Sequence, residues 1–262
     1  MTRNLRQSHT HGAEDTGYRL KTARGLDHSS PAGAQAADKP RPTAFVFDAY
    51  GTLFDFGGAV LRRTDSLGDK ASALVNRWRD KQLQYAWLRS LQGRYANFEQ
   101  VTADALDYAL DSLGIHDPGL RDDLLDLSFI PPIYADALGA LIRLQAAGMR
   151  AFILSNGTAS MLERAMAASA IAPYVEGVLS VDTVRTYKPS PRAYDLAVDA
   201  LGVPAGHMVF VSSNGWDAYA AAATGFRVLW CNRFSHPPER LPGVPEWQLR
   251  SLDDLQFPEF FR

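Results

Sequence analysis

Residues 43–55 read TAFVFDAYGTLFD, and this stretch decides how the folded part of the chain is interpreted. Ala44 to Phe47 is a short, continuously apolar run that ends at Asp48, with the turn-forming Gly51 close behind. Such a run, followed by a carboxylate and a turn, is typical of a strand that is buried on both faces. We therefore expect a buried strand that delivers Asp48 at its carboxyl end.

Similar apolar runs recur downstream and alternate with helical patterns. The runs cover residues 151–154, 178–181, 208–211 and 228–231. The helical patterns cover residues 134–147, 160–170, 191–201 and 217–224, and each closes near a glycine or a proline. Parallel strands need a crossover, and a helix is the usual one, so this alternation predicts an α/β fold: a Rossmann-like, doubly wound parallel sheet with helices on both faces.

One interval breaks the alternation. Residues 57–132 hold no strand-like run and at least three helical ones. This composition predicts a helical cap subdomain, inserted into an α/β core domain made of residues 43–56 and 133–262.

The longest helical pattern of the insertion covers about residues 69–91. One stripe of this pattern contains Leu74, Trp78, Tyr85 and Leu88, and an adjoining row contains Val75, Arg79, Leu83 and Trp87. A second helix is expected to begin at Asn97 as its N-cap, with Gln100 closing a capping box.

The composition limits the classes of function. The 262 residues are 46% hydrophobic and 21% charged, as in globular proteins, and the single cysteine, Cys231, permits no internal disulfide. The formal net charge of -2 offers no basic field for nucleic acid or an anionic membrane, and no run of about 18 apolar residues is present. We therefore expect a cytoplasmic protein whose partner is a small molecule, with no nucleic-acid and no membrane partner. Residues 1–42 are poor in large apolar side chains and are expected to form a disordered tail.

Polar side chains follow four of the predicted strands, and open parallel sheets bind ligands beyond the carboxyl ends of their strands. Asp48 follows the first strand, Ser155 to Gly157 the second, Lys188 the third after a gap, and Ser212 to Asp217 the fourth. Taken singly, each has an ordinary explanation as a turn residue, a helix cap, a first-turn acid or a solvated charge. Together, complementary groups from four strand ends predict one functional site.

The motifs FDAYGTLF, LSNG, YKP and SSNGWD occur in this order, and with them the chain resembles the haloacid dehalogenase superfamily, in particular its type II L-2-haloacid dehalogenases. The resemblance covers about residues 43–255, and the helical insertion falls where that superfamily carries its cap. It implies an (S)-2-haloacid dehalogenase, which converts L-2-haloalkanoic acids into D-2-hydroxyalkanoic acids and releases halide. It also suggests a homodimer.

The resemblance further implies roles for individual residues. Asp48 would attack C2 of the substrate and form an aspartyl ester, and Asp217 would activate the water that opens the ester. The implied catalytic residues are Asp48, Thr52, Arg79, Ser155, Asn156, Lys188, Tyr194, Ser212, Asn214 and Asp217. The implied substrate-binding residues are Ala49, Tyr50, Arg79, Leu83, Phe98, Ser155, Asn156 and Trp216.

Tyr50 bears on the choice between chemistries. Most members of the superfamily are magnesium-dependent phosphatases with a second aspartate at this position, which acts as a general acid for an alkoxide leaving group. A halide is a weak base and leaves without a proton, so tyrosine suits dehalogenation. Asp48 and Asp217 are a thin set of magnesium ligands, and we expect no metal and no cofactor. A phosphatase or phosphonatase of the same superfamily is the alternative, as is a non-catalytic binding protein on this fold.

Asp80 departs from the pattern of the enzymes that the chain resembles, which often carry glutamine after the cap arginine. A carboxylate facing the site would partly neutralise Arg79. Because adjacent helical residues point about 100 degrees apart, we expect Asp80 to face solvent.

Overall fold

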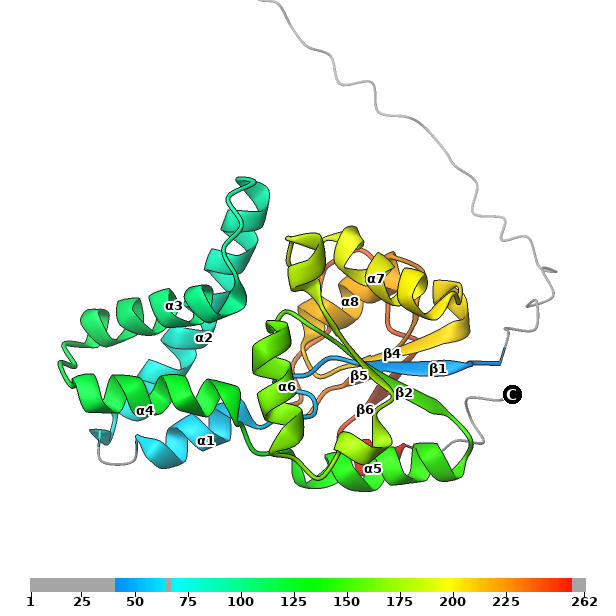
Figure 1. The fold of residues 1–262 in the computed structure, drawn as a ribbon, viewed down its shortest axis with the longest axis horizontal. Coiled ribbons are helices and arrows are strands. Elements are labelled where there is room, and N and C mark those ends of the chain that lie inside the picture. Colours follow the sequence, from blue (N-terminus) through cyan, green and yellow to red (C-terminus); the bar gives the residue numbers. More distant parts are fainter. Residues whose placement is uncertain (1–40, 65–66, 256–262) are drawn as a thin grey trace, which may run out of the picture. The chain divides into compact units, whose positions relative to one another are not determined.

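The computed structural model describes residues 41–64 and 67–255, and the tail expected for residues 1–42 lies almost entirely outside them. Within the described residues the sheet has six strands, all parallel, in the order β3-β2-β1-β4-β5-β6 (Figure 1). The strands are β1 (Ala44–Phe47), β2 (Arg150–Ser155), β3 (Gly177–Ser180), β4 (Met208–Ser212), β5 (Arg227–Cys231) and β6 (Trp247–Leu249). The predicted α/β fold is therefore confirmed.

Strand β1 lies in the middle of the sheet, where the strand order reverses. Phe47 is in register with Ile153 of β2 and with Val211 of β4. A switch point of this kind opens a crevice at the carboxyl ends of the strands, and Asp48 follows β1 directly into it.

Two strand predictions need correction. Strand β3 ends at Ser180, and Val181 opens a short 3-10 helix, Val181–Val184, because the Ser180 side chain accepts a hydrogen bond from the Asp182 amide and turns the chain. Strand β6 was not predicted. Its sequence, WQL, has a polar residue at its centre and is only partly buried, so it lacks the continuous apolar run that marks the inner strands.

Helices cover both faces of the sheet, which explains why β1 is apolar at every position. These helices are α5 (Ala135–Ala146), α6 (Ala159–Ala167), α7 (Pro191–Leu201) and α8 (Gly215–Ala223). Phe45 and Phe47 pack in one buried cluster with α5 and α6, and Val46 packs in a second cluster with α7 and α8. Figure 1 shows α7 and α8 on the face of the sheet opposite α5.

The insertion folds as four helices in the described residues: α1 (Phe56–Arg63), α2 (Lys70–Leu91), α3 (Phe98–Leu113) and α4 (Pro118–Phe129). They lie to one side of the sheet (Figure 1) and share an apolar cluster that contains Leu74, Trp78 and Leu106. The two segments that connect the insertion to the core run side by side. The Asp55 amide donates to the Pro132 carbonyl (2.7 Å), and the Tyr134 amide donates to the Leu53 carbonyl (2.8 Å). The exact domain boundaries given above stay a prediction.

The stripe predicted for α2 is correct at Leu74 and Trp78 and wrong at Leu88, which is 45% exposed. Gln82 and Ala86 are buried instead. A glutamine can occupy this face because its side-chain amide donates to the Thr102 hydroxyl at 2.8 Å, which satisfies its polar group inside the cap. Hydrophobic periodicity alone does not detect such a pair.

The predicted start of α3 is confirmed in part. Asn97 is the N-cap, and its side chain accepts from the Gln100 amide at 2.9 Å. The Gln100 side chain donates to Asp104 one turn further on, so it does not close a capping box.

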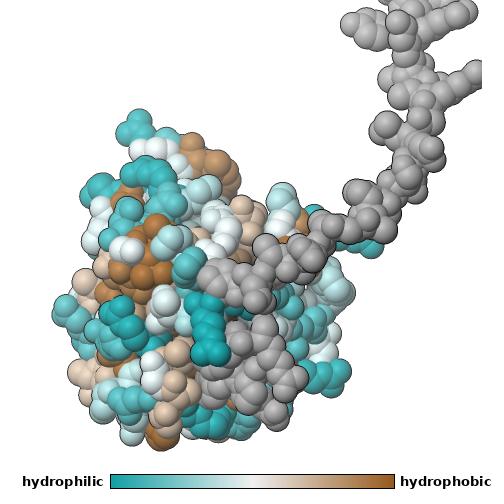
Figure 2. Space-filling model, turned by 90° about the vertical axis from the view of Figure 1, so that its right-hand side faces the viewer, coloured by the Kyte–Doolittle hydropathy of each residue, from teal (hydrophilic) through white to brown (hydrophobic). Residues whose placement is uncertain are grey.

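The surface has the mixture usual for a folded protein. On the face seen in Figure 2, hydrophobic residues form small patches between hydrophilic ones. At the end of α2, Leu88 and Leu91 are exposed, which agrees with the expected homodimer but does not test it. None of the helices in the described part of the chain is long and apolar enough to span a membrane.

Candidate active site

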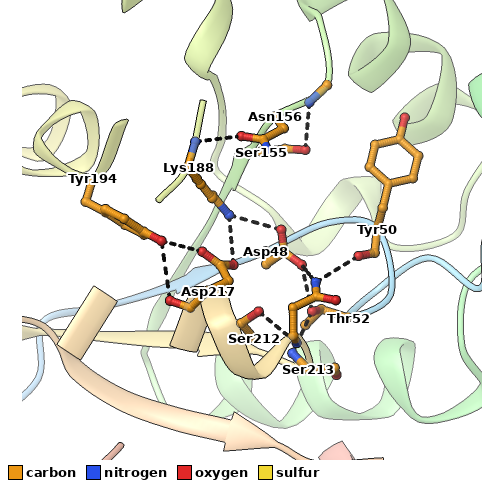
Figure 3. Close-up of polar contacts among 12 residues, drawn as sticks. Asp48, Tyr50, Thr52, Ser155, Asn156, Lys188, Tyr194, Ser212, Ser213 and Asp217 are labelled. Carbon is orange, nitrogen blue, oxygen red and sulfur yellow. Dashed lines mark hydrogen bonds and ion pairs between the residues drawn. The ribbon is translucent and has the colours of Figure 1, made fainter. Parts of the chain in front are cut away.

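The carboxyl ends of the central strands bring the predicted polar residues together (Figure 3). Asp48 follows β1, Ser155 ends β2 and Ser212 ends β4, while Asp217 sits in the first turn of α8. Lys188 arrives from the segment between the 3-10 helix after β3 and helix α7. A single parallel sheet thus aligns groups that are up to 169 residues apart in sequence, as the strand-end pattern predicts.

Asp48 has three hydrogen-bond donors around its carboxylate. The Thr52 hydroxyl (2.9 Å) and the Asn214 side-chain amide (2.8 Å) donate to Oδ2, and the Lys188 ammonium donates to Oδ1 at 3.0 Å. The residue is only 7% exposed. Donors of this kind favour the ionised form of a carboxyl group, which is the nucleophilic form.

Lys188 is a buried cation between two carboxylates. Its ammonium lies 3.0 Å from Asp48 Oδ1 and 3.1 Å from Asp217 Oδ2, and the side chain is 1% exposed. Burial works to lower the pKa of this lysine, but the attraction of Asp217 and Asp48 outweighs it and raises the pKa. The lysine therefore stays charged, and it is the main compensation for two buried negative charges.

Asp217 is fully buried, and its environment makes it a weaker acid than usual. Burial and the neighbouring charge of Asp48 raise its pKa to about 6, against the opposing effect of Lys188. The Tyr194 hydroxyl donates to Asp217 Oδ1 at 2.7 Å, and burial together with the same carboxylate raises the pKa of Tyr194. The tyrosine is thus a hydrogen-bond donor that orients Asp217.

Serine and asparagine side chains at the ends of β2 and β4 accept hydrogen bonds from nearby backbone amides. Ser155 Oγ accepts from the Gly157 amide and Ser212 Oγ accepts from the Asn214 amide, each at 3.1 Å. Asn156 Oδ1 accepts from the backbone amide of Lys188, also at 3.1 Å. These contacts hold both loops beside the Asp48 carboxylate and fix the start of the lysine segment.

Arg79 reaches this site from the cap. Its guanidinium hydrogen-bonds to Asn214 Oδ1, the side chain whose amide binds Asp48. Gly51 lies next to this pair: its φ of +88° is a conformation that favours glycine, and a Cβ there would lie 3.6 Å from Arg79 Nη2, which is an ordinary contact distance. Asp80 is exposed, as expected from its position on the helix.

The residues predicted to line an apolar substrate pocket do not lie together as the polar residues do. Tyr50 is half-buried between the cap and the loop after β2, and its hydroxyl donates to the Ser128 carbonyl at 3.1 Å. Trp216 packs against Trp87 of the cap, with ring centroids 5.4 Å apart.

Three other members of the predicted lining lie elsewhere. Phe98 packs on Tyr187 (5.7 Å), and the side chain of Ala49 is enclosed in the cluster of β1 with α5 and α6. Leu83 lines an open hollow on the surface of α2.

Two contributors were missed by the sequence analysis. The Trp87 indole of the cap donates to the Lys188 carbonyl at 3.1 Å. Arg233, just beyond β5, donates to the Thr52 carbonyl at 2.8 Å and pairs with Asp136, which also accepts from the Leu252 amide at 2.8 Å. The sequence holds a signal for each: Trp87 shares its helix row with Arg79, and Arg233 follows the predicted strand 228–231.

Among residues 41–64 and 67–255, no group of three or more His, Cys, Asp or Glu side chains is placed to hold a metal ion. Asp48 and Asp217 are bridged by the Lys188 ammonium.

Comparison with known proteins agrees with this geometry. The sequence profile of the haloacid dehalogenase-like hydrolases matches residues 42–225, which include Asp48, Lys188 and Asp217. The chain belongs to this family. The predicted superfamily resemblance is thereby confirmed.

Relatives of this haloacid dehalogenase-like hydrolase include characterised dehalogenases. An (S)-2-haloacid dehalogenase of Pseudomonas sp. strain CBS-3 is 43% identical over 213 residues, which are 81% of this chain and 94% of that protein. Among solved structures, a dehalogenase with an intermediate complex is 41% identical, with a TM-score of 0.80 over 82% of this chain and 96% of that one. An L-2-haloacid dehalogenase from Xanthobacter autotrophicus with chloropropionic acid covalently bound is 33% identical, with a TM-score of 0.75 over 81% and 96% of the two chains.

We expect the substitution Lys188→Met to lower the free energy of unfolding by about 3–5 kcal/mol, because it leaves two buried carboxylates without their cation. The matched control is Arg150→Met, which breaks the exposed Arg150–Glu176 pair (2.8 Å, both side chains 48% exposed) and should cost less than about 1 kcal/mol. Urea unfolding at pH 7.5 measures both. Equal decreases in the free energy of unfolding would contradict the importance assigned to the buried contacts of Lys188 with Asp48 and Asp217.

Proposed function

We propose that this family member is a hydrolytic (S)-2-haloacid dehalogenase, which converts L-2-haloalkanoic acids into D-2-hydroxyalkanoic acids and halide. The observation that carries the proposal is the Asp48 carboxylate, buried and paired with Lys188, next to a tyrosine rather than a second acid at position 50. The names of the relatives support the same reaction. Two of the three relatives described above are named (S)-2-haloacid or L-2-haloacid dehalogenase.

In the first half-reaction, an Asp48 oxygen attacks C2 of the substrate from the side opposite the halogen. A carbon–oxygen bond forms as the carbon–halogen bond breaks, the bonding pair leaves with the halide, and C2 is inverted. The donors around Asp48 position its carboxylate for this attack, and the Lys188 ammonium balances its negative charge.

The departing halide needs positive charge or amide donors that are already in position. In this proposal Arg79, Asn156 and Trp216 supply them, since the guanidinium is held above the site by Asn214. Ser155 and the amides of its loop bind the substrate carboxylate. Tyr50 and Trp216, the two members of the predicted lining that lie at the contact between cap and core, accommodate its alkyl group.

In the second half-reaction, water attacks the carboxyl carbon of the ester rather than C2. Asp217 accepts a proton from that water, and the bond between the carboxyl carbon and the ester oxygen breaks. The ester oxygen stays on C2 and takes up the proton from Asp217 to become the hydroxyl of the product, and Asp48 is regenerated as a carboxylate with release of one proton. Tyr194 orients Asp217, while Ser212 and Asn214 shape the loop beside it. Together, the two half-reactions convert the haloacid and one water molecule into the hydroxy acid, a halide ion and one proton.

A leaving group that needs no proton distinguishes this reaction from phosphate-ester hydrolysis. Burial and the charge of Glu99 raise the pKa of Tyr50, and its hydroxyl is already bonded to the Ser128 carbonyl. Such a group is a poor general acid at neutral pH. This supports dehalogenation over the phosphatase alternative.

Halide release from L- and D-2-chloropropionate, with and without a chelator, tests the proposed function. We expect chloride from the L-enantiomer only, at the same rate in EDTA, because carboxylate attack and halide departure require no Lewis acid. Loss of activity in EDTA with recovery in magnesium would favour the phosphatase alternative. Asp48→Asn should fold normally and release no chloride.

Heavy-oxygen water separates attack by Asp48 from attack by water. After many turnovers, mass spectrometry should find the label in the peptide that contains Asp48, because ester hydrolysis puts a water oxygen into that carboxylate. The hydroxyl of the first-turnover product should be unlabelled. A labelled first product with an unlabelled Asp48 would contradict the ester mechanism.

The pH dependence of turnover should report Asp217. Its pKa of about 6 is raised above the ordinary aspartate value, so the carboxylate is the major form above pH 6 and the minor form below it. Ester hydrolysis should slow by about tenfold per pH unit below that value, and the ester should accumulate. Quenching and mass spectrometry at pH 5 and pH 8 measure the accumulated ester. A rate that stays constant down to pH 4.5 would contradict the role of Asp217 as base.

Arg79→Ala should lower kcat by about 100-fold or more, which is typical for the loss of one preorganised donor, while the protein keeps its fold. Arg77→Ala is the matched control, because Arg77 lies on the same helix and its guanidinium bonds to Ser112 at the cap surface. The control should keep wild-type kcat in steady-state halide assays. If both variants were equally active, the assignment of Arg79 would be wrong.

A further inference from the structure

Two residues of α2, Arg79 and Trp87, contact the core. Arg79 contacts Asn214, and Trp87, two turns further on, contacts Lys188 and Trp216. The Trp87 indole donates to the Lys188 carbonyl at 3.1 Å, and its ring meets that of Trp216 edge to face. The cap therefore touches the lysine segment through a directional contact as well as through packing.

The peptide groups of Lys188 are held from two sides. Its amide donates to Asn156 in the core, and its carbonyl accepts from Trp87 in the cap. The preceding residue, Tyr187, is tied to the cap twice: its amide donates to Ser90 Oγ at 3.1 Å and its hydroxyl donates to the Ala96 carbonyl at 2.6 Å. The backbone that carries the lysine thus depends on both the cap and the core for its position.

We propose that Trp87 is a positioning residue: its hydrogen bond to the Lys188 carbonyl couples the docked cap to the placement of the Lys188 ammonium between Asp48 and Asp217. The role assigned to Lys188 in the reaction rests on the proposed function, but the coupling itself rests on these contacts alone. Without the indole donor, the segment keeps its contacts with Asn156, Ser90 and Ala96, but the Lys188 carbonyl loses its donor.

A small displacement of this ammonium has a large electrostatic consequence. The charge–charge energy falls with distance, and inside a protein it is far less screened than in water. The groups that face the ammonium are the two carboxylates, the Tyr194 hydroxyl behind Asp217 and the ring of Phe210, whose centroid lies 5.0 Å away. A retreat of the ammonium therefore weakens the stabilisation of both carboxylates.

Trp78 offers a matched control for Trp87. It lies on the same helix, and its indole also donates to a backbone carbonyl, that of Thr102 at 2.9 Å. This contact is buried within the cap and has no part in the lysine segment. Trp→Phe at either position removes the same indole donor and the same volume.

The experiment compares Trp87→Phe with Trp78→Phe in the full chain. For Trp87→Phe we expect kcat for halide release from L-2-chloropropionate to fall by about 3- to 10-fold, the effect of one lost hydrogen bond, with KM changed by less than about 2-fold. Trp78→Phe should lower the melting temperature and leave kcat at the wild-type value. Ser90→Ala, which removes the acceptor for the Tyr187 amide, should change kcat in the same direction as Trp87→Phe.

A second readout does not depend on catalysis. NMR titration of 13C-labelled aspartate should show the pKa of Asp217, about 6 in the wild type, moving up by about 0.3 to 1 pH unit in Trp87→Phe, since a 2- to 10-fold change in ionisation equals that shift. It should stay constant in Trp78→Phe. Equal behaviour of the two variants in both measurements would overturn the inference and leave Trp87 as a packing residue.

The two proposals fail in different ways. A wild-type protein that releases no halide contradicts the proposed function, and the titration then still decides the coupling between Trp87 and Lys188. An active wild type with an unmoved Asp217 titration in Trp87→Phe and Ser90→Ala contradicts the coupling only.

Discussion

The ammonium of Lys188, buried between Asp48 and Asp217, is the constraint on which the rest of the site depends. Two carboxylates inside a protein repel each other and lose their hydration, so without a cation at least one of them would take up a proton. With Lys188 at 3.0 and 3.1 Å, Asp48 can act as an anion while Asp217, with a pKa of about 6, remains able to accept a proton near neutral pH. One lysine thereby allows two similar acids to take different roles.

The architecture around this triad follows from the need to hold it rigidly. Asp48 follows strand β1, the loops that begin at Ser155 and Ser212 follow β2 and β4, and Asp217 lies in α8. The cap contributes Arg79 and Trp87. Arg233 fixes the backbone that follows Asp48, because it donates to the Thr52 carbonyl while the Thr52 hydroxyl binds Asp48. The charge of Arg233 is balanced by Asp136, whose pKa is lowered by that guanidinium and by backbone and serine donors despite its burial.

Much of this arrangement could be predicted from the sequence because strand ends of a parallel sheet converge whatever their separation along the chain. That rule brought Asp48, Ser155, Asn156 and Asp217 together, and the resemblance added Arg79 and Tyr194. Sequence patterns could not predict β6, because its three residues form no continuous apolar run. They also could not predict that Gln82 is buried, because its burial depends on a partner twenty residues away. The roles of Trp87 and Arg233 depend on which backbone carbonyl each side chain meets, and only tertiary structure determines that.

Tyr50 shows how a change of leaving group alters the demands on a site of this kind. An alkoxide must be protonated as it departs, so it requires an acid beside the nucleophile, whereas a halide leaves as a stable anion and requires a positive or amide-rich cradle instead. In this chain the side chain at position 50 forms a structural contact, since its hydroxyl bonds to Ser128 of the cap. The cap also supplies a cation, Arg79, which bonds to Asn214, the side chain whose amide binds Asp48. The position that serves proton transfer in a phosphatase thus helps here to hold the element that carries the positive charge, and a halide requires only that charge.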